Sequence, residues 1–119
     1  MWRDACMQWW TRKFRSVDRA RFNEIRTGEK QYETRAATEK YRAIREGDTI
    51  TFVCGKKRLE KEIAKVFYFR TPAAMRRGLP LAQVMPDLTT LAEVKARYAS
   101  YPDYTEKIQK FGLLAFKLR

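Results

Sequence analysis

The sequence predicts one α+β domain, in which a small mixed sheet curls into a barrel that carries short helices. Strand-like segments recur along the whole chain, and a run of short helices interrupted by prolines precedes the last of them. A chain of 119 residues is long enough for a single modest core, so we expect one domain over residues 1–119. The expected strands cover residues 11–14, 30–36, 49–54, 59–69 and 113–118.

The first ten residues form a Trp-rich arm ahead of the first expected strand. Trp9 and Trp10 are adjacent, so in an extended chain only one of them faces inward. The other is expected to lie exposed or to meet a partner. The arm is therefore a candidate surface for a protein partner.

A short helix is expected after the first strand. Ser16 is the candidate N-cap, and Asp18 in the first turn is favoured by the helix dipole. Phe22 and Ile25 are three residues apart, which places them on one face. Gly28 can take the left-handed conformation that ends a helix.

The middle of the chain predicts strands that are separated by turns. A strand over residues 30–36 is followed by a charged connection over 37–46 and a Gly-Asp turn at 47–48. Residues 49–54 alternate apolar and polar side chains, which indicates a half-buried strand. The Gly-Lys-Lys sequence at 55–57 is typical of a hairpin turn into the longest expected strand.

The second half is mainly helical until its end. Thr90 is expected to cap a helix whose apolar residues recur at three- and four-residue spacing, and a further helix is expected over 103–111. Gly112 then releases the chain into the last strand. The apolar face of the capped helix is formed by Leu91, Val94 and Tyr98.

The chain carries a formal charge of +12, with 26 Lys and Arg against 14 Asp and Glu. The excess is +7 in residues 1–65 and +5 in residues 66–119, so it is spread through the chain. A basic protein of this kind attracts polyanions, and RNA is the expected partner. The alternative is a charge that serves only solubility.

Other function classes receive no support from the composition. No stretch is long and apolar enough to span a bilayer, and residues 1–10 lack the pattern of a signal peptide. The chain has no histidine, and Cys6 and Cys54 form no CxxC pair, so no metal site and no cofactor are expected. We expect two reduced thiols in a cytoplasmic protein.

Lys30, Glu33 and Arg35 place a cation, an anion and a second cation within six residues. Glu33 and Arg35 are two apart on a strand and share one face, where they can serve as acceptor and forked donor for a base edge or phosphate. A structural ion pair is the alternative. Strict alternation puts Lys30 on the other face, so it joins the pair only if the strand begins irregularly after Gly28.

Further basic residues flank this cluster in the sequence. Arg12 and Arg26 belong to a group around the first helix, and Lys56 and Lys57 belong to the hairpin. We expect these side chains to contact phosphate; the alternative is a solvated surface. The phenylalanines at 52, 67, 69 and 116 fit strand patterns and are expected in the core, whereas Tyr32, Tyr41 and Tyr68 remain ambiguous.

The block Phe22-x-x-Ile25-x-x-Gly28-x-Lys30-x-x-Glu33-x-Arg35, followed by Ile44-x-x-Gly47-Asp48-x-Ile50-x-Phe52, resembles the ASCH domain family. The segment over residues 98–118 is similar to the usual ending of that family. The family belongs to the PUA-like superfamily of small β-barrels associated with RNA. The resemblance therefore implies a PUA-like barrel that binds RNA or a modified nucleoside in a cleft beside the Lys–Glu–Arg strand.

The resemblance also implies a second function, because some members hydrolyse the acetyl amide of acetylcytidine with a Lys, a Thr and a Glu. Lys30 matches the Lys, but Glu33 stands where the Thr is expected. Asp87 and Glu93 are the nearest carboxylates to the expected Glu. Glu33 is expected to keep Lys30 protonated, so hydrolysis here requires Glu33 to activate water while Lys30 stabilises the oxyanion.

Overall fold

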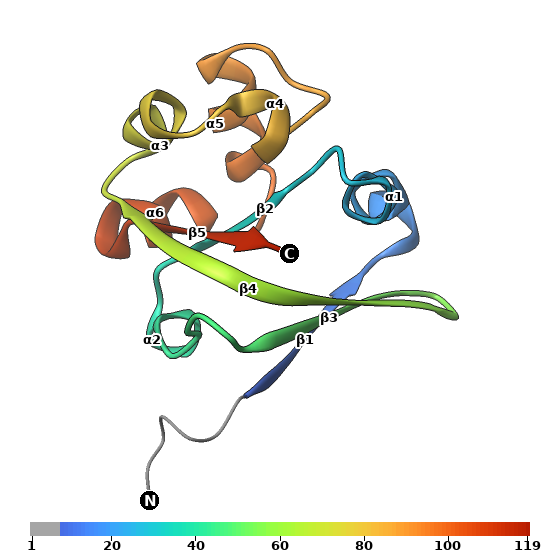
Figure 1. Cartoon of the computed structure of the whole chain (residues 1–119). Helices are drawn as coiled ribbons and strands as arrows, with labels where there is room; N and C mark the ends of the chain where they lie inside the picture. The colour runs from blue at the N-terminus through green and yellow to red at the C-terminus, as the bar shows by residue number, and fades with distance from the viewer. Residues whose placement is uncertain (1–7) are drawn as a thin grey trace, which may run out of the picture.

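Five strands form one curled sheet in the computed structural model, which describes residues 8–119 (Figure 1). Their order is β1-β3-β4-β5-β2, with β1 parallel to β3 and every other pair antiparallel. The order leaves β1 and β2 as the two edge strands. The strands are β1 (Trp9–Phe14), β2 (Tyr32–Ala36), β3 (Thr49–Cys54), β4 (Lys57–Phe69) and β5 (Leu113–Leu118).

The long strand β4 connects the two halves of the sheet. Its residues 57–62 pair with β3, and its residues 63–69 pair with β5. A register shift between Ile63 and Lys65 marks the change of partner. Such irregularities bend a strand and increase its twist, so β4 curls the sheet into a half-barrel, which is consistent with the small mixed barrel predicted from the sequence.

The helices lie at the ends and on one side of this sheet. In Figure 1, α3, α4 and α5 gather at the top of the view above β2, and α1 lies on the right. They are α1 (Arg19–Thr27), α2 (Glu39–Arg42), α3 (Pro72–Gly78), α4 (Leu81–Val84), α5 (Leu91–Ala99) and α6 (Tyr104–Phe111), with a 3-10 turn over Ser16–Asp18. The helical insertion before the last strand is therefore confirmed. No helix in residues 8–119 is long and apolar enough to cross a membrane.

Two helix boundaries follow the local sequence. Gly28 ends α1 with a φ of 87°, a left-handed conformation that glycine adopts without a steric penalty. Thr90 caps α5: its side chain accepts from the Glu93 backbone N–H, and the Glu93 carboxylate accepts from the Thr90 backbone N–H at 3.0 Å. This reciprocal pair satisfies donors that a helix start leaves free.

Several expected boundaries were wrong. β1 begins at Trp9, because it pairs with β3 from that residue, so the end of the expected arm belongs to the sheet. Ser16 starts a 3-10 turn and is not the N-cap of α1, and a short helix, α2, lies within the connection expected over 37–46. β2 begins at Tyr32, and β4 begins at Lys57 after a two-residue turn. The predictions for Cys6 and for the rest of the Trp-rich arm, residues 1–7, lie outside the described residues.

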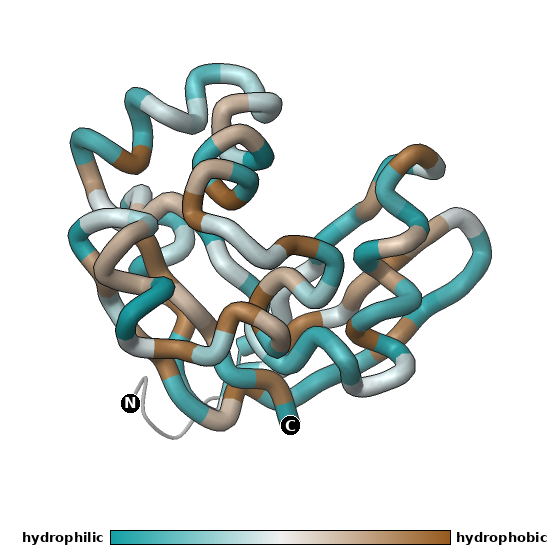
Figure 2. Tube along the Cα trace, turned by 90° about the horizontal axis from the view of Figure 1, so that it is seen from above, coloured by the Kyte–Doolittle hydropathy of each residue, from teal (hydrophilic) through white to brown (hydrophobic). Residues whose placement is uncertain are grey.

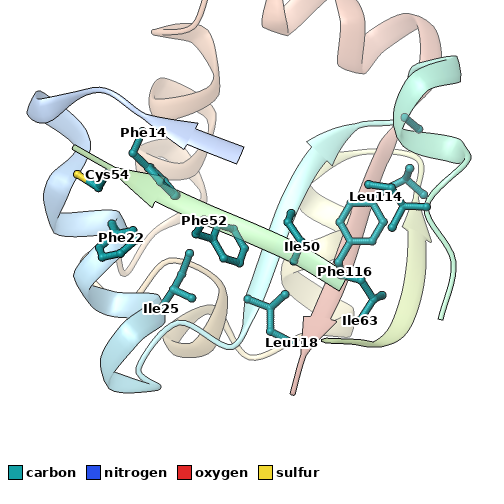
Figure 3. Close-up of a cluster of buried hydrophobic side chains, with 12 residues drawn as sticks. Phe14, Phe22, Ile25, Ile50, Phe52, Cys54, Ile63, Leu114, Phe116 and Leu118 are labelled. Carbon is teal, nitrogen blue, oxygen red and sulfur yellow. The ribbon is translucent and has the colours of Figure 1, made fainter. Parts of the chain in front are cut away.

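Two apolar clusters pack against the sheet. In the first, shown in Figure 3, side chains of α1 and the strands converge around Phe52 and Phe116, which are both fully buried. The second joins β2 and β5 to the helices after β4, with Met75, Val94 and Leu113 at its centre. β2 therefore has a buried environment on both faces, which explains how it holds polar residues away from bulk water.

The aromatic side chains follow the sequence predictions in part. Trp9 is 63% exposed, whereas Trp10 turns inward and donates from its indole N–H to Asp48 at 3.0 Å. Tyr32 is buried and Tyr68 is exposed. Phe67 and Phe69, expected in the core, are partly buried against the second cluster. Seen from above in Figure 2, hydrophilic residues occur along the whole trace and are not confined to one segment.

Candidate functional site

The open side of the half-barrel lies between the edge strands β1 and β2, and we call it the seam. Arg12 on β1 and Glu33 on β2 bridge it, with Arg12 Nε 2.8 Å from Glu33 Oε2. Glu33 is buried, and the Arg12 side chain is 26% exposed. Because Glu33 is buried, loss of Arg12 would leave its carboxylate without a partner away from water, which is costly.

A cavity of about 40 Å³ lies at the seam, and we call it the seam cavity. It has room for about three water molecules, given that one needs roughly 10–15 Å³. The lining combines cations, hydroxyl groups and one carboxylate. It consists of Arg12, Phe14, Arg21, Lys30, Glu33, Thr34, Arg35, Met85, Arg97, Tyr98, Tyr101 and Tyr104.

Lys30 reaches this cavity because it precedes the regular part of β2. Its backbone N–H donates to the carbonyl of Glu24 in α1 at 2.9 Å, and the ladder with β5 starts only at Tyr32. This is the irregular start that the sequence required for Lys30 to join Glu33. The Lys30 side chain is buried and its Nζ donates to the carbonyl of Val84 at 2.5 Å.

Burial controls the charge of Lys30. Desolvation lowers the pKa of its amine below 10.5, and the nearby Glu33 carboxylate raises the pKa without reversing this effect. The expected influence of Glu33, which favours the protonated amine, agrees in direction with this. Burial opposes that influence, and the sequence did not reveal how deeply Lys30 is buried.

Arg35, which lines the same cavity, lies close to two tyrosine rings. Its guanidinium carbon is 4.6 Å from the ring centre of Tyr41 and 6.0 Å from that of Tyr104. One terminal nitrogen donates to the Tyr41 hydroxyl at 2.7 Å. The Nε of Arg35 is buried and has no hydrogen-bond partner within residues 8–119. A buried donor without an acceptor is uncommon, and a bound ligand is one explanation for it.

Two tyrosine hydroxyls attach β2 to the helical insertion. The Thr34 hydroxyl is 2.6 Å from the Tyr98 hydroxyl, and the Ala36 backbone N–H donates to the Tyr104 hydroxyl at 2.9 Å. Burial raises the pKa of Tyr98 far above its usual 10.0, so its hydroxyl keeps its proton. The helices therefore position the wall of the cavity through polar contacts as well as packing.

The two carboxylates nearest to the expected catalytic Glu have structural partners instead. Asp87 pairs with Arg97 and lies 3.3 Å from Arg21, and its hydrogen bond with Arg97 lowers its pKa. Glu93 belongs to the capping box of α5. Neither residue lines the seam cavity, where Glu33 is the carboxylate.

A wider basic groove adjoins the seam cavity. Its volume is about 480 Å³, and it shares Arg12, Arg35, Tyr101 and Tyr104 with that cavity. Clefts of roughly 300–1,000 Å³ are the usual size for small-molecule sites. We call it the basic groove; it is lined by Arg12, Lys13, Arg15, Asp18, Arg35, Tyr101, Pro102, Tyr104 and Lys107.

The structure brings together four of the seven residues predicted for the site: Lys30, Glu33, Arg35 and Arg12. The other three lie elsewhere. Arg26 is an exposed residue in the last turn of α1, and Lys56 and Lys57 are exposed at the β3–β4 turn. None of these three lines the seam cavity or the basic groove. Within residues 8–119 there is no group of three or more His, Cys, Asp or Glu that could hold a metal ion.

Several residues of the cavity lining were not predicted for the site, because they come from distant segments: Arg97, Tyr101 and Tyr104. Tyr98 was expected only on an apolar helix face. Arg21 belongs to the basic group around the first helix that was expected to contact phosphate. One signal was present. Tyr98, Tyr101 and Tyr104 recur every three residues around Pro102, a spacing that suits one shared side of the chain.

Comparison with known proteins shows the fold but assigns no family. No protein-family model matches the chain, and no curated protein matches it either. Among solved structures, the crystal structure of the hypothetical protein PH0355 superposes with a TM-score of 0.78 and 25% identity, over 95% of this chain and 98% of that one. The solution structure of PF0455 from Pyrococcus furiosus superposes with a TM-score of 0.73 and 24% identity, over 94% of this chain and 96% of that one. The chain is thus similar to both over nearly its whole length.

Proposed function

We propose that this chain is an ASCH-type domain of the PUA-like superfamily that binds RNA or a modified nucleoside at the seam cavity and basic groove. Three residues of the quoted sequence block, Lys30, Glu33 and Arg35, line one cavity. Their convergence supports the resemblance, because alternation alone would have separated Lys30 from the other two. The curled five-stranded sheet agrees with the small barrel that the family implies.

The observation that carries the proposal is the state of Arg35. It holds a positive charge close to two tyrosine rings, beside the buried Lys30, with a buried Nε that has no partner within residues 8–119. Folding alone gains little from such an arrangement, because an unsatisfied buried donor costs about 1–3 kcal/mol. A ligand with an acceptor group would satisfy it.

The basic groove supplies the other features that a nucleotide ligand requires. Lys13, Arg15 and Lys107 can contact phosphate, and the rings of Tyr101 and Tyr104 can stack on a base. These two rings are 5.5 Å apart and nearly perpendicular, at 80°, so they form a fixed aromatic corner. Phosphate contacts and stacking together favour single-stranded RNA over a duplex, whose bases are not available to stack.

The experiment is binding of short single-stranded and duplex RNA across a salt series, measured by fluorescence anisotropy. We expect single-stranded RNA to bind with a steep salt dependence, and Lys30→Ala/Arg35→Ala to abolish binding while the circular dichroism spectrum is retained. Lys56→Ala/Lys57→Ala is the matched control, because it removes two positive charges outside the site. If both double variants lost RNA affinity equally, the cavity would be rejected as the binding site.

Amide hydrolysis of an acetylated cytidine is the second candidate. It is favoured by Lys30, because burial lowers the pKa of its amine and thereby favours the neutral form. We expect Lys30→Ala to remove hydrolysis of acetylcytidine if this function is present. Unchanged hydrolysis in that variant would exclude Lys30 from the chemistry.

A protein-interaction module is the third candidate, and it is supported by the exposure of Trp9. This hypothesis predicts that RNA does not bind even at low salt. It also predicts that Trp9→Ala leaves the fold intact but removes binding of a protein partner. RNA binding that survives Trp9→Ala would favour the seam instead.

A further inference from the structure

We infer that the seam cavity receives a terminal phosphate group, so that the preferred ligand is an RNA end or a nucleotide that carries a phosphomonoester. The inference rests on the proposed function and adds the chemical group that the cavity recognises. It follows from the charge balance of the cavity, from its size and from its closed inner end.

The charge balance singles out Arg35. Four guanidinium groups line the cavity, and three of them have carboxylate partners: Arg12 pairs with Glu33, and Arg21 and Arg97 pair with Asp87. Arg35 has no carboxylate within ion-pair distance among the described residues. Its hydrogen-bond partner is the neutral hydroxyl of Tyr41. The Glu33 carboxylate attracts this guanidinium only at longer range and is already paired with Arg12, so the cavity carries a guanidinium without a direct anionic partner, which an anion would supply.

The remaining charges do not reverse this balance. Glu33 is the carboxylate of the lining, and its charge is opposed by Arg12 at 2.8 Å. Lys30 adds a nitrogen donor at the same cavity. An incoming anion thus meets Arg35 and Lys30 as donors, while Arg12 offsets the repulsion from Glu33. A tetrahedral phosphate, with several acceptor oxygens, suits forked guanidinium donors.

The size and shape of the cavity favour a chain end. A volume of about 40 Å³ accommodates a small group rather than a base with its sugar. The lining includes Lys30, Met85 and Tyr98, which are only 7%, 4% and 3% exposed, so we infer that these residues close the inner end of the cavity. An internal phosphodiester must continue into a nucleoside on both sides and cannot enter a closed pocket. A terminal phosphate can enter, with its nucleoside beside Tyr101 and Tyr104 in the basic groove.

The test compares matched RNA hexamers that differ only at their ends: 5′-phosphate, 3′-phosphate, or hydroxyl at both ends. We expect one phosphorylated hexamer to bind wild-type protein about tenfold or more tightly than the hydroxyl form, as for a hydrogen bond to a charged group. The two phosphorylated arms identify which RNA end is recognised. Arg35→Gln should remove the preference, because it loses the charge and the forked donors, whereas Arg35→Lys should only weaken it, because it keeps the charge but loses Nε.

Two controls separate this inference from its alternatives. Lys107→Ala, in the groove but not in the cavity, should weaken all hexamers alike and keep the preference. The NMR signal of the Arg35 Nε–H in wild-type protein should shift with the preferred hexamer and not with the hydroxyl form, which requires no variant to fold. Equal binding of all hexamers by wild-type protein would overturn the terminal-phosphate inference alone. No binding of any hexamer at low salt would overturn the proposed function as well.

Discussion

Arg12 and Glu33 join the two free edges of the sheet, with Nε and Oε2 2.8 Å apart across the seam. They are 21 residues apart in the chain and lie on β1 and β2, which are at opposite ends of the strand order. The contact forms only when the sheet curls. Since Glu33 and Arg12 also line the seam cavity, closure of the half-barrel and assembly of the site are one structural event.

The seam pair should stabilise the fold asymmetrically. Arg12→Met leaves a buried carboxylate without its partner and should lower the free energy of unfolding by about 1.5–3 kcal/mol. Glu33→Gln should lower the free energy of unfolding by less, because the Arg12 side chain is 26% exposed and water can solvate it. Urea unfolding of both variants and of the double variant gives the coupling energy. Additive losses would show that the two side chains do not stabilise each other.

Lys30 should make stability depend on pH. Its pKa is lower in the folded protein than in the unfolded chain, so between the folded value and 10.5 the unfolded chain binds more protons. The free energy of unfolding should therefore rise with pH across that window, and should be lowest below it, where the buried amine is charged.

Lys30→Met should reduce this rise and stabilise the protein at the acidic end of the window. The difference between wild type and variant, measured by urea unfolding from about pH 6 to 9, cancels the contributions of other groups. Lys30→Gln is the control that keeps a donor for the Val84 carbonyl. A difference that does not change with pH would contradict the lowered pKa.

The hydroxyls of Thr34 and Tyr98 should be energetically coupled. Thr34→Val or Tyr98→Phe alone leaves one buried hydroxyl without its partner at 2.6 Å and should cost about 1–3 kcal/mol. The double variant should lose less unfolding free energy than the two single variants together, because it removes both polar groups. Thermal unfolding of the three variants measures this, and a fully additive result would mean that the hydroxyl contact contributes nothing.

Phosphate contacts should be confined to the groove. Lys107→Ala should reduce the slope of log K against log salt for single-stranded RNA by about one unit, whereas an exposed lysine elsewhere should change it little. Lys57→Ala, at the start of β4, is the matched single-charge control. If Lys57→Ala changed the slope more than Lys107→Ala did, the hairpin and not the groove would be the phosphate-binding surface.

Gly112→Ala should destabilise the fold more than Gly55→Ala. Gly112 has φ 88° and ψ −167°, a conformation nearly restricted to glycine, and an added Cβ would lie 2.3 Å from the Tyr68 hydroxyl. Gly55 has φ 61° and no atom near an added Cβ. We expect a loss of about 1–3 kcal/mol at Gly112 from backbone strain. Similar melting temperatures for the two variants would contradict this.

Local patterns in the sequence predicted most elements of the fold. The alternation over Thr49–Cys54 places Ile50, Phe52 and Cys54 in the core, because a strand turns every second side chain to one face. Gly28 and Thr90 end and begin helices where their backbone and side-chain chemistry requires it. Boundaries were less accurate. Trp9 and Lys57 join strands through pairing with β3, which local composition does not encode.

For the site, the sequence by itself determined that Glu33 and Arg35 share a face of the strand predicted there, since residues two apart in a strand point to the same side. Tertiary structure decided the rest. It placed Arg12 against Glu33, buried Lys30 deeply enough to lower its pKa, and set Tyr98 and Tyr104 against β2. Desolvation and contacts between distant segments depend on how the chain packs, and spacing along the sequence carries no record of that packing.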